Sequence, residues 1–106
     1  MNVEAGWTAV ATTDELHDAT MKPFELDGRR LLLVRAEGRY FVIDEMCSHE
    51  DYSLALGCIK GTRIKCSLHG SYFDLASGQP LDEPADEAIR TFPVRTDGGT
   101  IYTRVD

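Results

Sequence analysis

The sequence predicts an all-β fold, arranged as an antiparallel β-sandwich or barrel. Three observations support this prediction. Short runs rich in β-branched and aromatic residues recur along the 106 residues, separated by glycine or proline. Glycine-containing turn sequences stand between adjacent runs, where β-hairpins need them. Finally, a helical pattern occurs in a single short stretch of the chain.

Eight runs have the composition of strands, at residues 7–11, 22–26, 30–35, 39–44, 62–66, 71–75, 89–95 and 100–105. The pairs Asp27-Gly28 and Glu37-Gly38, together with residues 97–99, are expected to form hairpin turns between neighbouring strands. Residues 12–19 predict two turns of helix, because Thr12 and Glu15 have the spacing of a capping box. His17 lies in this segment and is expected to be an exposed bystander.

Composition and charge narrow the possible functions. The chain has 18 acidic and 11 basic residues and a net charge of −7, so binding to nucleic acid or to an anionic membrane is not expected. Residues 1–6 contain no targeting pattern, and the longest apolar run, 54–59, is far too short to cross a bilayer. Together with an odd number of cysteines, this predicts a cytoplasmic protein. The length predicts one domain, residues 1–106.

The rare metal-ligand residues gather in two short motifs near the middle of the chain. These are Cys47-Ser48-His49 and Cys66-Ser67-Leu68-His69, which contain two of the three cysteines and two of the three histidines. Thiolate and imidazole together suit zinc or an iron–sulfur cluster. A structural zinc site usually takes both cysteines from one motif and both histidines from the other. Here each motif has one of each, which favours a [2Fe–2S] centre with two histidines on one iron, although zinc stays open as an alternative.

At these residues the chain resembles Rieske-type ferredoxins of bacterial aromatic-ring-hydroxylating dioxygenase systems. The resemblance rests on residues 47–49, 66–74 and 77–78 and on Pro84. It implies a two-layer β fold with one [2Fe–2S] cluster at a tip, between loops at about 46–61 and 66–74. Cys47 and Cys66 would bind the inner iron, and His49 and His69 the outer iron. A loop at about 76–87, containing Pro84, would cover the cluster, and Gly70 would permit a tight turn beside it.

The resemblance also suggests a branch of the family. Rieske proteins of cytochrome bc complexes have an additional cysteine in each loop, joined in a disulfide, but Tyr52 and Leu68 occupy those positions here. In that high-potential branch a serine and a tyrosine hydroxyl bond to cluster sulfur. Ser71 matches the serine, whereas Phe73 replaces the tyrosine, so we expect a potential in the lower half of roughly −150 to +300 mV. The third cysteine, Cys58, is interpreted as a small packing residue.

The resemblance implies a one-electron carrier between a flavin-containing reductase and a terminal oxygenase, not an enzyme in itself. An oxygenase would need a further iron held by two histidines and a carboxylate, and only His17 is left to supply one. Rieske ferredoxins of iron–sulfur assembly systems, nitrite reductase small subunits and a Cys2His2 zinc scaffold are the alternatives. The acidic residues 82, 83, 86 and 87 are expected to be solvated or to steer basic partners.

Overall fold

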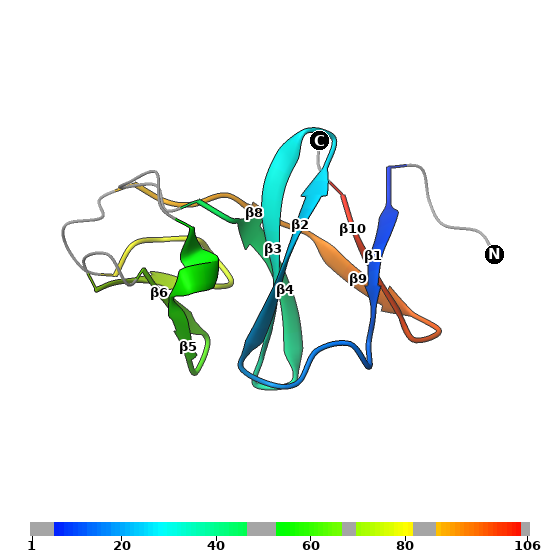
Figure 1. The fold of residues 1–106 in the computed structure, drawn as a ribbon, viewed down its shortest axis with the longest axis horizontal. Coiled ribbons are helices and arrows are strands. Elements are labelled where there is room, and N and C mark those ends of the chain that lie inside the picture. Colours follow the sequence, from blue (N-terminus) through cyan, green and yellow to red (C-terminus); the bar gives the residue numbers. More distant parts are fainter. Residues whose placement is uncertain (1–5, 47–52, 67–69, 82–86, 105–106) are drawn as a thin grey trace.

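The computed structural model describes residues 6–46, 53–66, 70–81 and 87–104, which form three antiparallel sheets (Figure 1). The first sheet has the order β1 (Thr8–Thr12), β10 (Thr100–Thr103), β9 (Val94–Asp97). The second has the order β2 (Thr20–Leu26), β3 (Arg29–Ala36), β4 (Arg39–Asp44), β8 (Thr91–Phe92). The third has the order β5 (Cys58–Lys60), β6 (Arg63–Cys66), β7 (Ser71–Asp74), and the 3₁₀-helix η1 (Leu54–Leu56) precedes it. The all-β prediction is confirmed, and among the described residues there is no helix that could cross a membrane.

The second sheet lies between the other two and is covered on both faces (Figure 1). Successive side chains of a strand point to opposite faces. Leu31 and Leu33 of β3 therefore join a core on the side of the first sheet, while Leu32 and Val34 join a core on the side of the third. The first core also contains Ala11, Leu16, Val42 and Ile101. The second also contains Ala36, Phe41, Ile43, Leu54, Ile64, Cys66, Phe73, Leu75 and Ile89.

The predicted hairpin turns are present. Asp27-Gly28 joins β2 to β3 and Glu37-Gly38 joins β3 to β4, each as the two residues between the closing pair of the hairpin. All four residues have positive φ, between 51° and 77°, as a type I′ turn requires. Glycine tolerates this conformation at the second position, where it is most strained for other residues.

The predicted helix at residues 12–19 is wrong; this segment forms turns between β1 and β2. The capping interaction itself is made, since the Thr12 N–H donates to the Glu15 carboxylate over 2.9 Å. Tertiary contacts then prevent a helix. Leu16 is buried in the first core, the Asp18 carboxylate accepts the N–H groups of the Glu37-Gly38 turn, and Ala19 has φ of 62°. His17 is exposed, as predicted.

Two further differences concern strands. The run 89–95 is divided into β8 and β9 at Pro93, which has no N–H to donate to a neighbouring strand. The strand β5 was not predicted, because three residues are too few to show an alternating pattern. Its alternation places Ile59 inward and its two neighbours outward, so Cys58 is exposed and the interpretation of Cys58 as a packing residue is wrong.

The turn between β1 and β2 leads to a prediction about Glu15. A hydrogen bond from Lys22 Nζ, 2.6 Å long, and further hydrogen bonds from Thr12 lower the pKa of Glu15 to about 2. A lowered carboxylate pKa stabilises the folded state above the unfolded-state value of 4.5, and this contribution is lost as pH falls from there through about 2. NMR titration should give a midpoint near 2 in the wild type and a clearly higher one in Lys22→Ala. Equal midpoints would contradict the role of Lys22.

Candidate metal centre

The β6–β7 hairpin positions the predicted ligand Cys66. Cys66 is the last residue of β6 and pairs with Ser71, the first residue of β7. The Gly70 N–H donates to the Cys66 carbonyl over 2.8 Å, and Gly70 has φ of 79°, so the turn predicted at this glycine is confirmed. Cys66 is 1% exposed and belongs to the core between the second and third sheets, so its thiol points inward.

Ser71 lies on the same inward face as Cys66. Directly paired residues on neighbouring strands have Cβ atoms roughly 4.5–5.5 Å apart and point to the same side of the sheet. Ser71 is 1% exposed, so its side chain, like that of Cys66, is shielded from bulk water. Phe73, two residues further along this face, is fully buried in the second core and brings no hydroxyl to it.

This arrangement predicts the effect of Ser71→Ala on the reduction potential. A hydrogen bond to cluster sulfur stabilises the reduced form, which has the greater negative charge. Removing the hydroxyl should therefore lower the potential, while the cluster content and the visible spectrum stay close to those of the wild type. Protein-film voltammetry on both proteins measures the difference. An unchanged potential would show that the hydroxyl bonds elsewhere, and Ser77→Ala, at an exposed serine beyond β7, is the control.

The chain on either side of residues 47–52 is tied together by backbone pairing. Met46 and Ser53 form an antiparallel bridge, and the Leu54 N–H donates to the Glu45 carbonyl over 2.7 Å. The predicted ligands Cys47 and His49 fall between these anchors and outside the described residues. The second anchor continues into η1, whose Leu54 is fully buried in the same core as Cys66. The two predicted ligand segments therefore start from the same end of the molecule.

The buried carboxylate of Glu45 adds side-chain hydrogen bonds to this backbone pairing. Glu45 is 6% exposed and accepts a hydrogen bond of 2.6 Å from Ser53 Oγ. It also accepts two from Arg30, from Nε over 3.1 Å and from Nη2 over 3.2 Å. Glu45 lies two residues before the segment 47–52 and Ser53 directly after it, so this network connects the two ends of that segment to β3. Sequence reasoning missed it, although an acidic residue directly after an apolar strand was a signal.

Close backbone contact also links η1 to the cysteine-bearing strand. Gly57 follows η1, and a Cβ built on it would lie 1.7 Å from the Lys65 carbonyl oxygen. Lys65 directly precedes Cys66, so only glycine allows the exit of the first segment to pack this closely against the second. The sequence offered no signal for this requirement, since the contact joins residues eight positions apart through the fold.

The chain that leads to the predicted covering loop runs beside β7. Phe73 forms a bridge with Pro80, and the Leu81 N–H donates to the Tyr72 carbonyl over 2.8 Å. The segment therefore runs antiparallel to β7, toward Ser71 and the hairpin end. Pro84 itself lies outside the described residues, as does His69.

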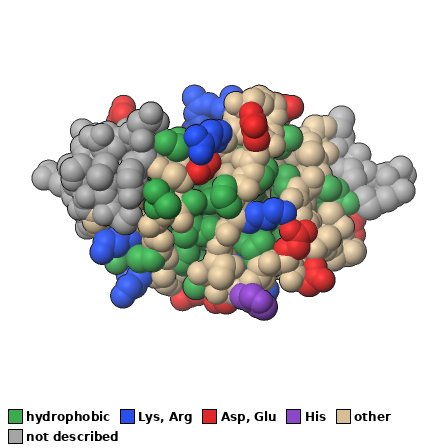
Figure 2. All heavy atoms as spheres, viewed as in Figure 1, with side chains coloured by type: hydrophobic (Ala, Val, Ile, Leu, Met, Phe, Trp, Pro, Cys, Tyr) green, Lys and Arg blue, Asp and Glu red, His purple; other side chains and the backbone are tan. Residues whose placement is uncertain are grey.

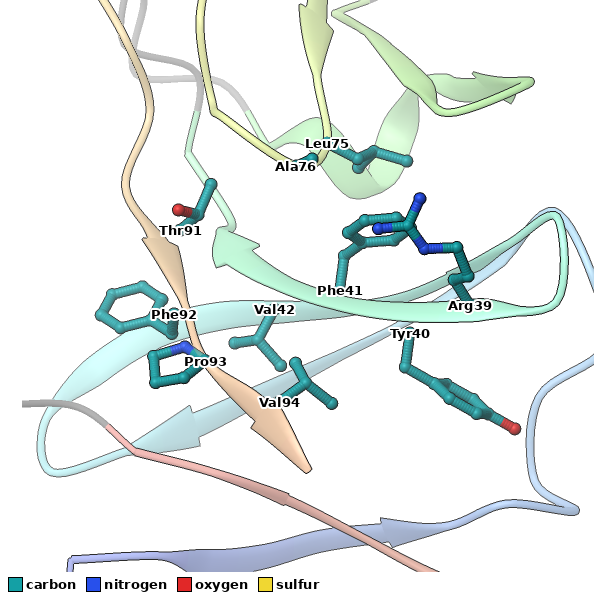
Figure 3. Close-up of a pocket in the computed structure, with 10 residues that line it drawn as sticks. All are labelled: Arg39, Tyr40, Phe41, Val42, Leu75, Ala76, Thr91, Phe92, Pro93 and Val94. Atoms are coloured by element: carbon teal, nitrogen blue, oxygen red, sulfur yellow. The ribbon is translucent and has the colours of Figure 1, made fainter. Parts of the chain in front are cut away.

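The described residues alone contain no group of three metal-ligand side chains, since three of the four predicted ligands lie outside them. What is described fits an iron–sulfur cluster at the hairpin end. Cys66 offers a soft thiolate ligand in a nearly dry environment, and the serine paired with it, Ser71, lies on the same buried face. A hollow between β4 and the β8–β9 segment is a separate feature (Figure 3). Its lining includes Leu75 and Ala76, which follow the end of β7 opposite to Ser71.

The described residues define a small all-β domain with a hairpin that carries a buried cysteine at its end, near the base of the 47–52 segment. Residues 6–93 match the Rieske [2Fe-2S] domain family, and the chain belongs to that family. Its cofactor is one Rieske-type [2Fe–2S] cluster.

Relatives of known role cover nearly the same length. The chain is 32% identical over 97 residues to a 3-phenylpropionate/cinnamic acid dioxygenase ferredoxin subunit of Photorhabdus laumondii, which covers 91% of each chain. It is 31% identical to the ferredoxin component of an alkene monooxygenase system of Xanthobacter autotrophicus, over 87% of this chain and 75% of that one. Among solved structures, the ferredoxin of carbazole 1,9a-dioxygenase from Nocardioides aromaticivorans superposes with a TM-score of 0.91 at 29% identity, over 96% of this chain and 100% of that one.

Proposed function

We propose that this protein is a cytoplasmic one-electron carrier that passes electrons from a flavin-containing reductase to the terminal oxygenase of a ring-hydroxylating dioxygenase system. The observation that carries the proposal is the family match over residues 6–93, together with a hairpin that buries a single thiol at its end. Ferredoxins of two dioxygenase systems are among the relatives of matching length. The partners are proposed from the names of these relatives.

Four residues are proposed as cluster ligands: Cys47 and Cys66 for the inner iron, and His49 and His69 for the outer iron. The burial of Cys66 supports its place on the inner iron. The paired anchors Met46 and Ser53 support a contribution from the loop between them. The whole chain, residues 1–106, is proposed to be the single domain built around this cluster.

The single histidine that remains after the cluster ligands are assigned agrees with an electron carrier that performs no substrate chemistry. A mononuclear oxygen-activating iron takes two histidines and a carboxylate. Once His49 and His69 are assigned to the cluster, His17 is the one histidine left in the sequence, and it is exposed in the turn region before β2. The chain therefore lacks the ligands for a second iron centre of the oxygenase type.

The test has two stages. Purified protein should contain about two irons per chain and give a reduced-state EPR signal with average g below 2. A colourless protein with one zinc would overturn the cluster and support the zinc alternative. Loaded protein should then be reduced by NADH through a flavin reductase and oxidised by a ring-hydroxylating dioxygenase. If it supports only a monooxygenase, the kind of system that one relative serves as ferredoxin component, the dioxygenase assignment is replaced. If it supports neither, the carrier role is wrong.

A further inference from the structure

The outer face of the third sheet is positively charged in a protein of net negative charge. Alternation along the strands places three cations on this face, and we call them the basic face: Lys60 on β5 with Arg63 and Lys65 on β6. Cross-strand pairing brings them together, because Lys60 pairs directly with Arg63. Lys65 lies two residues beyond Arg63 on β6, at the next position on the same side of the sheet. In Figure 2, Lys and Arg side chains gather over β5 and β6, the strands placed at the lower left of Figure 1.

The described strands of the third sheet carry a positive charge, opposite in sign to the net charge of the chain. Residues 53–66 and 70–81 contain three cations and one anion, Asp74, which leaves +2, whereas the chain carries −7. Asp74 is engaged locally, since it accepts hydrogen bonds of 2.8 and 2.9 Å from Ser77. The Glu37 carboxylate lies near Gly61, in the turn between β5 and β6. Within the described residues, none of the three cations has an ion pair with a carboxylate.

An aromatic ring organises the basic face. Tyr72 of β7 pairs with Lys65, and its ring lies under two of the cations. Arg63 Cζ is 5.4 Å and Lys65 Nζ 5.9 Å from the ring centroid. Such contacts hold long cationic side chains over a ring without neutralising them, so their charge stays available to a partner. Tyrosine and arginine are also enriched where proteins bind each other.

The basic face lies close to the predicted cluster. Lys65 directly precedes Cys66, and its side chain extends along the hairpin, with Cε 3.6 Å from the position of a Cβ on Gly70. Two exposed leucines border the third sheet at this end: Leu56 before β5 and Leu81 beside β7, with exposed fractions of 64% and 47%. Exposed apolar side chains beside polar or charged ones are available for contact with a protein partner.

We propose that the basic face docks an acidic surface of a redox partner protein, so that association on this side depends on local charge and not on the net charge of −7. The acidic residues 82, 83, 86 and 87, which lie mostly outside the described part of the chain, predict steering toward basic partners. The basic face is a separate surface with the opposite preference. This inference rests on the proposed function only in that the chain must carry an electron.

The test uses the reduced holoprotein and two protein electron acceptors, acidic plastocyanin and basic cytochrome c, in stopped-flow experiments. Raising ionic strength from about 10 to about 150 mM shortens the Debye length from about 30 to about 8 Å. If net charge governs association, oxidation by plastocyanin becomes faster, because repulsion is screened. If the basic face docks plastocyanin, oxidation becomes several-fold slower.

Single charge reversals locate the effect. Lys60→Glu and Arg63→Glu should abolish or invert the salt dependence with plastocyanin and leave oxidation by cytochrome c at least as fast. Arg29→Glu, at an exposed position on the second sheet, changes the net charge equally and should retain the wild-type behaviour. A wild-type rate that rises with salt, or equal effects of all three variants, would overturn the inference. Absence of the cluster EPR signal from the wild-type protein would instead count against the proposed function.

Discussion

Cys66→Ser should yield protein without a [2Fe–2S] cluster. The hydroxyl of serine is a hard, weakly acidic ligand that replaces a thiolate poorly on iron. Cys66 is almost fully buried at the end of β6, so no other described cysteine can take its place; the remaining one, Cys58, points to the opposite face. Iron per chain should fall from about two to near zero, with loss of the visible bands and of the EPR signal.

Cys58→Ser provides the matched control for this prediction. It removes one thiol from the same sheet, at an exposed position on the outer face, where it pairs with Lys65. Cluster content and reduction potential should match the wild type. A full cluster spectrum in Cys66→Ser, or loss of the cluster in Cys58→Ser, would contradict the assignment of Cys66 as a ligand.

Gly57→Ala should strongly destabilise the folded protein. Its Cβ would lie 1.7 Å from a backbone oxygen, that of Lys65, which cannot rotate away as a side chain can. The strands must separate beside Cys66, at a cost of about 3 kcal/mol, the upper end of the usual range for overpacking. In a chain of this length that corresponds to a Tm lower by roughly 12–24 °C.

Gly28→Ala separates this clash from the general cost of replacing glycine. Gly28 has φ of 77°, and a Cβ there would have no atom within 4 Å, so the expected cost is the strain of a left-handed alanine, about 1–2 kcal/mol. Gly57 has φ of −91°, where alanine suffers no such strain. Thermal unfolding and iron content should both show the larger loss for Gly57→Ala. If the two variants unfold at the same temperature, the close contact at Gly57 is not essential.

Local signals predicted the framework of the fold well. The strand at 39–44 and the Asp27-Gly28 and Glu37-Gly38 turns were predicted correctly, because adjacent residues determine their backbone conformation. The segment 12–19 was predicted wrongly, because the burial of Leu16 and the hydrogen bonds of Asp18 to a distant turn outweigh a local helical preference. Long-range contacts of this kind leave no pattern in the local sequence.

In the candidate site too, features with a local sequence signal were predicted and features that depend on long-range contacts were not. Ligand types and spacing identified the two motifs and the family, since few proteins combine a cysteine and a histidine in each of two short segments. The residues that support the site were not foreseen. Glu45 and Ser53 come together through the Met46 bridge, and Gly57 meets Lys65 only when η1 packs on β6. These contacts depend on the folded arrangement of segments whose local sequence is unexceptional.

The burial of β3 on both faces has a consequence for how the molecule opens. Its amides bond to β2 on one side and β4 on the other, and its consecutive side chains serve two separate cores. Hydrogen exchange from β3 should therefore require global unfolding, whereas the short strands of the third sheet can exchange through smaller openings. The third sheet can then open locally while the second sheet keeps its structure.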